Sequence, residues 1–315
     1  MLLPKEGIAL KQFYQTLEEW MVKYKKNSVK TATYDRMLVS FKLMKNYKIS
    51  YVYLDKLCSD DIQEYINHLV KDGYALTTIK KQYNLITGFI KYANVEGLIS
   101  RPLYHNVKLP SQSVVHKPKR DVVAYNDIEQ MNLRRVLKTH ARIEYDVATF
   151  MMETGTRIGE ALAICWRDIN WARRSIRIDK TLVRLCSKGQ TFLQNEAKSY
   201  SSNRTIPLST DALTLLKYLY EKEDDPSGYV FHDENGNSLT YEAMRWHITI
   251  ACRQAKVPYF GQHVFRHTFA TNCYHRGCDV KVLSKLLGHA DVTVTYNTYI
   301  HLFGDNLEEM RKVLE

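Results

Sequence analysis

The sequence predicts a mainly α-helical protein with a small antiparallel β-sheet, divided between two domains. Three observations lead to this prediction. Apolar residues recur every three or four positions through residues 8–97, as they do on the buried face of a helix. A polar, basic stretch with two prolines, PSQSVVHKPKRD, follows at 110–121. Beyond it, helical stripes enclose short segments in which apolar and polar residues alternate, as they do in strands.

Residues 8–97 are expected to form four helices, of which the third and fourth end near Gly73 and Gly97. We therefore predict a helical domain over residues 1–108 and a linker over 109–121. The apolar stripes contain Leu10, Phe13, Leu17 and Trp20; Leu38, Phe41 and Met44; Ile62, Tyr65, Ile66 and Leu69; and Ile79, Leu85, Ile86, Phe89 and Ile90.

A second domain is expected over residues 122–302. Residues 303–315 predict a C-terminal amphipathic helix, which could pack on its own domain or on a neighbouring subunit. Its apolar residues are Phe303, Leu307, Met310 and Leu314. Within the second domain, the segments SIRIDKTLVR, TFLQNEAK and RTIPL predict short strands. Helical stripes occur at 127–138, 143–152, 158–165, 211–222, 241–255 and 264–276.

The composition is that of a folded protein and excludes several other classes. Of the 315 residues, 45% are hydrophobic and 25% are charged, which suits about two ordinary domains. No apolar run approaches the roughly 20 residues that span a bilayer, and the start MLLPKEG does not resemble a signal peptide. We therefore expect a cytoplasmic protein. The six cysteines include no C-x-x-C pair, so we expect free thiols.

The chain is basic, because Lys and Arg exceed Asp and Glu by 11. Residues 1–110 hold 17 basic against 10 acidic side chains and therefore carry most of this excess. An excess of cations attracts polyanions and speeds encounter with nucleic acid. Charge alone leaves anionic membranes and ribosomal RNA open as partners too.

Five short segments of the second domain carry residue types that suit one reaction. In chain order they read TGTRIGEAL, NEAKSYSSNRTIPL, HVFRHTFAT, LLGHAD and TYNTYIH. This ordered set resembles the tyrosine recombinase family, and its ending is similar to that of phage and transposon integrases. The resemblance covers about residues 8–301. It implies an N-terminal SAM-like core DNA-binding domain, a mixed α/β catalytic domain, and site-specific recombination of double-stranded DNA attachment sites in a bacterial cytoplasm.

Carried over residue by residue, the resemblance implies a nucleophile and five further catalytic side chains. The chemistry accounts for their types, because a phosphodiester under attack gains negative charge that two fork-shaped guanidiniums match. A tyrosine hydroxyl must lose its proton as it attacks, and one imidazole could accept it while another donates to the phosphate. Glu160 is expected to support either Arg157 or the helix end. The catalytic residues are Arg157, Lys198, His263 as base or hydrogen-bond donor, Arg266, His289 as a further donor and Tyr299 as nucleophile.

Lys198 is expected to protonate the departing 5′ oxygen, which is otherwise a very poor leaving group. The product is a 3′-phosphotyrosyl bond that retains the energy of the phosphodiester. Strand exchange then proceeds through a four-way junction. The implied reaction therefore needs neither ATP nor a metal or other cofactor.

Two of these assignments compete with a simple structural interpretation. Arg157 and Glu160, three residues apart at a helix start, could form only a surface ion pair. Tyr296 competes with Tyr299 as nucleophile, since it lies one helical turn earlier. The spacing of ten residues after the G-H segment favours Tyr299 through the resemblance.

The catalytic lysine and the histidine pair also have competing interpretations. Lys180 and Lys188 compete with Lys198 as the acid, although only Lys198 lies in an A-K-S segment followed by N-R-T-I-P-L. His263 and His267 have the spacing of a metal-binding pair on a helix. No closed ligand set completes that pair, although three further candidates lie nearby in sequence: Cys273, His275 and Cys278.

The basic first domain is expected to contact DNA phosphates, and the family forms a clamp of two domains around the duplex. These residues could instead form a solvated helix face or, in the linker, a solvated tether. Candidate phosphate contacts are Lys23, Lys25, Lys26, Lys30, Lys80 and Lys81, with Lys117, Lys119 and Arg120 in the linker. Side chains that could reach base edges from the fourth helix are Thr77, Thr78 and Gln82.

The resemblance also implies a homotetramer that works on two DNA sites, with an excision factor or a host DNA-bending protein as further partners. A type IB topoisomerase shares the phosphotyrosyl chemistry but acts as a monomer. A catalytically silent DNA-binding regulator could use the same fold. The C-terminal apolar stripe and the T-Y-I-H ending argue against a topoisomerase, and the presence of every reactive residue type argues against a silent regulator.

Overall fold

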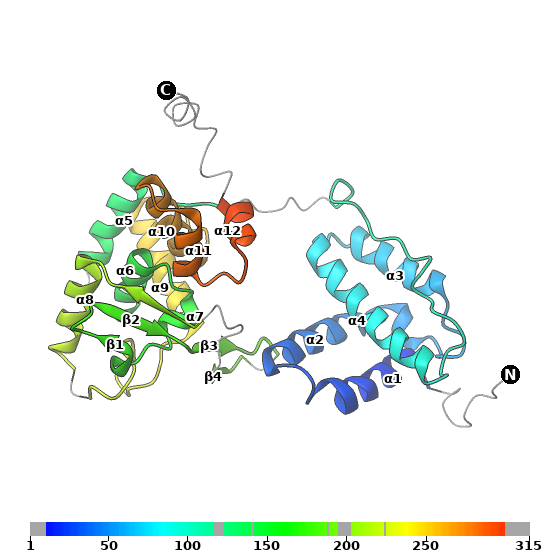
Figure 1. The fold of residues 1–315 in the computed structure, drawn as a ribbon. Coiled ribbons are helices and arrows are strands. Elements are labelled where there is room, and N and C mark those ends of the chain that lie inside the picture. The colour runs from blue at the N-terminus through cyan, green and yellow to red at the C-terminus, as the bar shows by residue number, and fades with distance from the viewer. Residues whose placement is uncertain are drawn as a thin grey trace. The chain divides into compact units, whose positions relative to one another are not determined.

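The structure is a computed structural model that describes residues 11–115, 122–139, 142–187, 189–194, 203–223 and 225–299. The chain divides into two compact units (Figure 1). The first contains Met1–Arg120 together with Leu185–Gln190, and the second contains Asp121–Arg184 and Thr191–Glu315. None of the helices in the described ranges is long and apolar enough to cross a bilayer.

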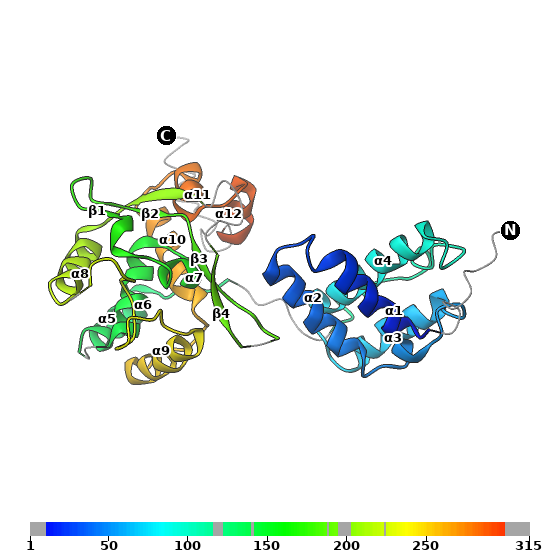
Figure 2. The same cartoon turned by 90° about the horizontal axis from the view of Figure 1, so that it is seen from below.

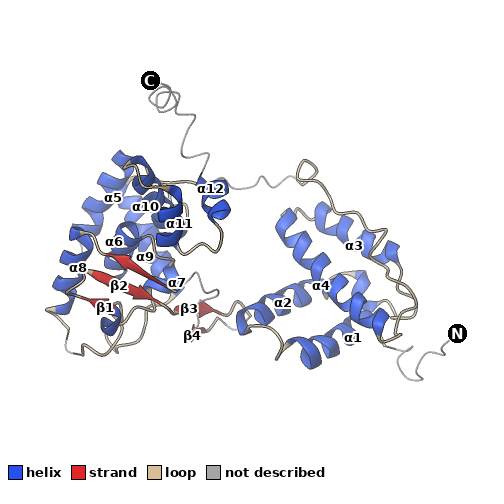
Figure 3. Cartoon of the chain, in the orientation of Figure 1, coloured by secondary structure: helices blue, strands red, loops and turns tan. Residues whose placement is uncertain are grey.

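The first unit consists of the four predicted helices, which the structure confirms (Figure 3). Helix α1, Phe13–Trp20, continues into a π-helical turn at Met21–Lys25. Then follow α2, Thr31–Met44, a short 3-10 helix at Lys48–Tyr51, α3, Ser59–Lys71, and α4, Leu76–Val95. Their apolar stripes form one core, in which the most deeply buried side chains include Phe13, Leu17, Ile62, Ile66, Ile86 and Phe89.

Helix α3 illustrates how local chemistry sets a helix start in this unit. The backbone N–H of Cys58 donates to Asp61 Oδ2 at 2.9 Å, which occupies a group that the helix itself leaves unpaired. Asp60 and Asp61 lie in the first turn, where negative charge complements the helix dipole. Beyond this start, the buried positions recur every three or four residues: Ile62, Tyr65, Ile66 and Leu69.

The second unit is built around helix α6, Ile143–Thr154. Most of this helix is buried, and it contacts α5, α7, α8, α9 and α10. A helix of that kind must be covered all round, so it occupies the centre of the unit. The covering helices are α5, Asp127–Thr139; α7, Ile158–Ala161; α8, Thr210–Tyr220; α9, Tyr241–Ala255; and α10, His263–His275. Helices α11, Val280–Leu287, and α12, Val292–Tyr299, complete the described chain.

Two small antiparallel sheets accompany these helices (Figures 2 and 3). The first contains β1, Ile169–Asn170, β2, Ser175–Ile178, and β5, Arg204–Pro207, in the order β1-β2-β5. Its register pairs Ile178 with Arg204. The second is a hairpin of β3, Thr181–Arg184, and β4, Thr191–Gln194. The predicted class, mainly α with a small antiparallel sheet, is therefore confirmed.

Several elements differ from the prediction, including helix α12, which was not among the predicted helical stripes. Helix α7 ends at Ala161 instead of continuing to residue 165, because the backbone N–H of Cys165 donates to Asp168 Oδ2 and Cys165 pairs with Tyr229 in a β-bridge. Strand β1 has only two residues and was not predicted. Helix α11 was not predicted either, although Asp279 caps its start and accepts from the backbone N–H of Lys281 at 2.8 Å.

Candidate active site

The described candidate catalytic residues lie at element ends in the second unit. Arg157 precedes α7, and His263 and Arg266 lie in the first turns of α10. His289 follows the turn after α11, and Tyr299 ends α12. Helix α10 contacts α6, α11 and α12, which brings segments far apart in sequence to one place.

Glu160 lies between two guanidiniums. The Arg157 backbone N–H donates to Glu160 Oε2 at 2.9 Å, and its guanidinium donates to Oε1 at 2.7 Å. From strand β5, Arg204 Nη2 donates to Glu160 Oε2 at 2.8 Å and Nη1 to Oε1 at 3.3 Å. Burial alone would raise the pKa of Glu160, but the charges and hydrogen bonds of Arg204 and then Arg157 lower it to about 2. Glu160 is therefore ionised at neutral pH.

Arg157 forms the ion pair that the simple structural interpretation expected, but it is not confined to a surface pair. Its carboxylate partner Glu160 is only 6% exposed, whereas 35% of the Arg157 side chain remains exposed. Arg157 Nη2 also lies 3.5 Å from the carbonyl oxygen of Gly288, in the turn that leads to His289. The guanidinium is thus held from one side and open on the other.

Arg266 is buried and bound by backbone carbonyls at two chain turns. Nη1 donates to the carbonyl of Gly155 at 2.8 Å, and Nη2 donates to that of Leu287 at 2.6 Å. Gly155 and Gly288 both have a left-handed backbone, with φ of 65° and 67°. Burial, followed by the charge of the nearby Arg157, lowers the pKa of Arg266 to about 9, so the guanidinium still carries its charge at neutral pH.

His289 is neutral and its tautomer follows from its neighbours. Burial, followed by the charges of Arg266 and Arg157, lowers its pKa to about 4. Arg266 Nη2 can only donate, so His289 Nε2, 2.9 Å away, must accept. The proton then lies on Nδ1 and is donated to Thr295 Oγ1 at 2.7 Å. The predicted donation from His289 to a phosphate therefore requires the other tautomer, with Thr295 donating in return.

His263 is exposed at the start of α10. Partial desolvation by the surrounding protein lowers its pKa, and the charges of Arg266 and then Arg157 lower it further. The imidazole is therefore neutral at pH 7 and has a lone pair with which to accept a proton. Its ring centre lies 6.3 Å from that of His267.

Tyr299 is buried, with 1% of its surface exposed, and packs in a small apolar cluster with Ala270, Leu283 and Leu287. Its hydroxyl lies 3.1 Å from His267 Nδ1. Burial raises the pKa of Tyr299, and the Arg266 charge opposes that increase without cancelling it. The hydroxyl is therefore protonated at neutral pH and needs a base before it can attack.

Two further residues bear on the assignment of Tyr299 as nucleophile: Tyr296, which competes with it, and His267, which contacts it. Tyr296 is 51% exposed and lies outside the apolar cluster that contains Tyr299. His267, for which the sequence predicted no catalytic role, contacts the Tyr299 hydroxyl. Among the described residues, His, Cys, Asp and Glu side chains form no group of three or more that could hold a metal ion. The metal-free reaction stays a prediction.

Of the three competing lysines, two lie outside the described residues: Lys198 and Lys188. Lys180 is 9% exposed and pairs with Asp168, and its Nζ lies 3.6 Å from Asp179 Oδ1. The Lys180 ammonium is therefore paired with two carboxylates, which makes Lys180 a poor candidate for the general acid that protonates the leaving oxygen.

The structure corrects one of the predicted DNA contacts. Gln82 is only 1% exposed, and its Oε1 accepts from the buried Tyr65 hydroxyl at 3.0 Å, so it cannot reach a base edge in this conformation. Lys25 and Thr78 are half-buried. The exposed candidates are Lys23, Lys26, Lys30, Thr77, Lys80 and Lys81. The linker candidates lie outside the described residues: Lys117, Lys119 and Arg120.

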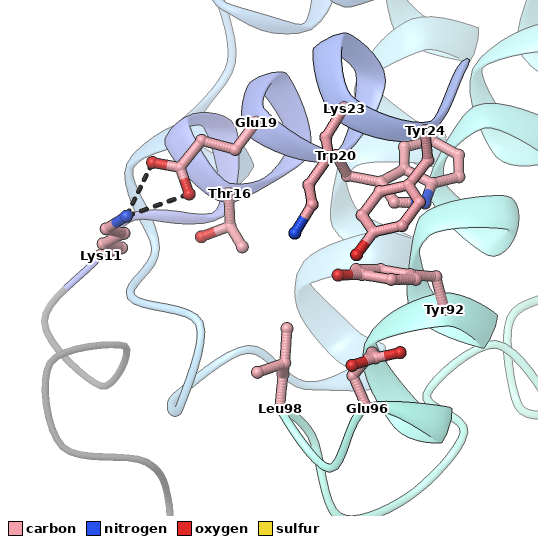
Figure 4. A pocket seen from close by; sticks show the side chains of 9 residues that line it. All are labelled: Lys11, Thr16, Glu19, Trp20, Lys23, Tyr24, Tyr92, Glu96 and Leu98. Carbon is pink, nitrogen blue, oxygen red and sulfur yellow. Dashed lines mark hydrogen bonds and ion pairs between the residues drawn. The ribbon is translucent and has the colours of Figure 1, made fainter. Parts of the chain in front are cut away.

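A pocket of about 240 Å³ lies in the first unit, where α1 and the π-helical turn face the end of α4 (Figure 4). Lys11 donates to Glu19 at one edge, and Lys23 extends into it beside the Tyr24 ring. None of the candidate catalytic side chains lines this pocket. Its lining residues are Lys11, Thr16, Glu19, Trp20, Lys23, Tyr24, Tyr92, Glu96 and Leu98.

Comparison with known families agrees with this arrangement. The sequence model of the Phage integrase family matches residues 123–305, and that of the Phage integrase SAM-like domain matches residues 12–109. The chain belongs to the phage integrase family. The resemblance to tyrosine recombinases that the five segments carry is therefore confirmed.

Relatives of this phage integrase family member include recombinases and mobile-element proteins. It is 26% identical over 309 residues to a "Tyrosine recombinase XerC-like" protein of Caldanaerobacter subterraneus subsp. tengcongensis, covering 91% of this chain and 78% of that one. It is 24% identical to the transposase of transposon Tn916 from Enterococcus faecalis, covering 86% and 70%. The integrase of Staphylococcus phage L54a is 23% identical, covering 96% and 92%.

Solved structures share the fold of this integrase-family chain. The Tn1549 transposon integrase in complex with transposon right end DNA superposes with a TM-score of 0.80 at 18% identity, covering 97% of this chain and 100% of that one. A lambda integrase tetramer bound to a Holliday junction gives 0.67 at 14% identity, covering 91% and 77%.

Proposed function

We propose that this protein is a site-specific DNA recombinase that cuts and rejoins DNA strands through a 3′-phosphotyrosyl intermediate formed by Tyr299. One observation carries the proposal. Arg157 and Arg266 both reach the turn at 287–289, where their guanidiniums lie against the carbonyls of Gly288 and Leu287. Two permanent cations that converge on one turn suit a phosphate whose charge increases in the transition state.

The roles of the histidines follow from their protonation. His263 is neutral at pH 7 and can accept the proton of the Tyr299 hydroxyl, either directly or through a relay. His289 changes tautomer when a phosphate takes its place as the partner of Arg266, and it then donates from Nε2. Lys198 protonates the departing 5′ oxygen, so cleavage and rejoining proceed without ATP or metal.

In the protein without DNA, the nucleophile Tyr299 is buried. Its hydroxyl is buried, lies 3.1 Å from His267 Nδ1 and is close to the Arg266 guanidinium. The proposed reaction therefore requires that DNA binding expose this hydroxyl, which lies at the end of α12 in the cluster with Ala270, Leu283 and Leu287. The exposed lysines of the first unit contribute phosphate contacts that position the duplex.

Assembly as a homotetramer on two DNA attachment sites, with exchange through a four-way junction, completes the proposal. It is supported by the lambda integrase tetramer bound to a Holliday junction, whose fold this chain shares. The C-terminal stripe predicted over 303–315 lies outside the described residues, and its docking on a neighbouring subunit is part of the proposal. An excision factor or a host DNA-bending protein would then decide the direction of the reaction.

A cleavage assay with matched tyrosine variants tests the nucleophile. A nicked suicide substrate, on which cleavage cannot be reversed, is incubated with wild type, Tyr299→Phe or Tyr296→Phe in excess chelator. We expect a covalent adduct with wild type and Tyr296→Phe, none with Tyr299→Phe, and similar DNA binding by all three. Mass spectrometry of the phosphotyrosyl peptide identifies the residue. An adduct on Tyr296, or activity that disappears with chelator and returns with a divalent ion, would contradict the proposal.

A further inference from the structure

Arg204 is a third arginine of the site, and neither the sequence motifs nor the proposed reaction gives it a role. It begins strand β5, and only 6% of its side chain is exposed. Its guanidinium contacts both oxygens of Glu160, and its Nε donates to the carbonyl of Leu286 at 2.6 Å. One side chain therefore joins the sheet, the start of α7 and the end of α11.

The contact with Leu286 lies where a cation stabilises a helix end. Leu286 is in the last turn of α11, whose terminal carbonyls lack partners within the helix. Gly288 follows, and a Cβ built there would lie 2.9 Å from Arg204 Nη1. Arg204 thus packs against the turn that presents His289 and that both Arg157 and Arg266 approach.

Arg204 also affects how far Glu160 neutralises the charge of Arg157. With Arg157 as its only partner, the single carboxylate would neutralise the guanidinium that is needed at the phosphate. Arg204 makes a bidentate pair with the same carboxylate, and its charge contributes more than that of Arg157 to the low pKa of Glu160. Arg157 therefore keeps a net positive field on its exposed side.

We propose that Arg204 is a positioning residue of this active site, which holds Glu160 and the turn at 286–288 so that Arg157 and His289 face the scissile phosphate. This inference rests on the proposed recombinase function. Arg204 acts through its neighbours, because its own guanidinium is buried and bound to Glu160 and Leu286.

The first experiment compares Arg204→Gln and Arg204→Lys with wild type in single-turnover cleavage of a suicide substrate. Misplacement of a charged group by about 1 Å can cost about 100-fold in rate, so we expect Arg204→Gln to cleave about 100-fold more slowly. DNA affinity should change by less than about threefold. Arg204→Lys keeps the charge but not the bidentate geometry, and should recover only part of the rate. The matched control is Arg177→Gln on β2, an arginine that is 67% exposed and paired with Asp179.

Two further measurements separate positioning from a general loss of structure. Arg157→Ala with Arg204→Gln should be far less than about 100-fold slower than Arg157→Ala alone, because both changes remove the contribution of Arg157 and only the positioning of His289 is lost in addition. A methylphosphonate at the scissile position removes the charge that Arg157 stabilises. On that substrate, the rate difference between wild type and Arg204→Gln should shrink, as it should for Arg157→Ala.

Each outcome decides the inference. Wild-type rates for Arg204→Gln, effects of Arg204 and Arg157 that multiply, or an equal defect on both substrates would overturn it. If Arg204→Gln does not fold, Arg204→Lys undergoes the same double-variant and methylphosphonate tests and decides in its place. Absence of a Tyr299 adduct with wild type would instead overturn the recombinase function itself, so the two failures can be told apart.

Discussion

Replacing Glu160 by glutamine should destabilise the second unit by ~3 kcal/mol at pH 7. A pKa of about 2 in place of the ordinary 4.5 means that the ionised carboxylate stabilises the folded state by ~3 kcal/mol. Removal of one partner from a buried ion pair costs about 3–5 kcal/mol in other proteins, which agrees with this magnitude. The glutamine amide would also point a donor group at guanidiniums that can only donate.

Urea unfolding of the full chain, followed by tryptophan fluorescence, measures this loss. Three of the four tryptophans, Trp166, Trp171 and Trp246, belong to the second unit, so the signal reports mainly on its unfolding. Glu242→Gln is the matched control. Glu242 pairs with Arg184 at the surface, where the two side chains are 55% and 46% exposed, and its loss should cost less than about 1 kcal/mol.

The pH dependence of the same difference tests its cause. A carboxylate with a lowered pKa stabilises the fold fully above the unfolded value of 4.5, and this contribution disappears as the pH falls towards 2. The difference between wild type and Glu160→Gln should therefore be constant from pH 7 to about pH 5 and shrink below it. A loss below about 1 kcal/mol at pH 7, or a difference independent of pH, would refute the ion-pair reasoning.

Two more predictions concern proton transfer during cleavage. Lys198→Ala should be severely slowed on normal DNA but recover much of its rate on a 5′-phosphorothiolate, because a thiolate leaves without protonation, whereas Arg157→Ala should not recover to the same extent. Equal defects on both substrates would remove Lys198 as the acid, and Lys188 would be tested next. The pKa of His263 is lowered from the ordinary value of 6.5, so its imidazole should stay unprotonated as the pH falls to 6.5. The cleavage rate should therefore decrease only below that pH. A rate that already halves near pH 7.5 would contradict this assignment.

Long periodic segments of the sequence predicted their helices well, whereas short elements were not predicted. Helix α4 carries its apolar stripe over Leu76–Val95, and its presence was clear from spacing alone. Helix α11 has eight residues and β1 has two, too few for a period to stand out. The position of β1 depends on pairing with another element, since Ile169 pairs with Ile176 on β2.

For Gln82, the spacing along the helix predicts burial, whereas the polar residue type suggested an exposed side chain. Ile79, Gln82, Ile86 and Phe89 lie three or four residues apart and are all buried on one face of α4. A polar side chain on a buried stripe requires a partner, and Tyr65 supplies it. Polarity suggested a DNA contact, but position on the helix indicated the core.

For the candidate site, motifs in the sequence could name residues but not their arrangement. The N-R-T-I-P-L segment contained Arg204, yet its bonds to Glu160 and Leu286 arise only when β5, α7 and α11 meet. The contact of His267 with Tyr299 likewise joins residues 32 positions apart. Such long-range pairs are set by tertiary packing, which leaves no local period in the sequence.

The two left-handed glycines impose a limit on how this protein can be diversified. A Cβ at Gly155 would lie 2.3 Å from the Phe269 ring, and one at Gly288 would meet Arg204, so any other residue would combine backbone strain with a collision. Both turns also hold the carbonyl acceptors of Arg266, at Gly155 and Leu287. In a mutagenesis library selected for altered DNA targets, these two codons carry no useful variation, and randomisation is better spent on the exposed surface of the first unit.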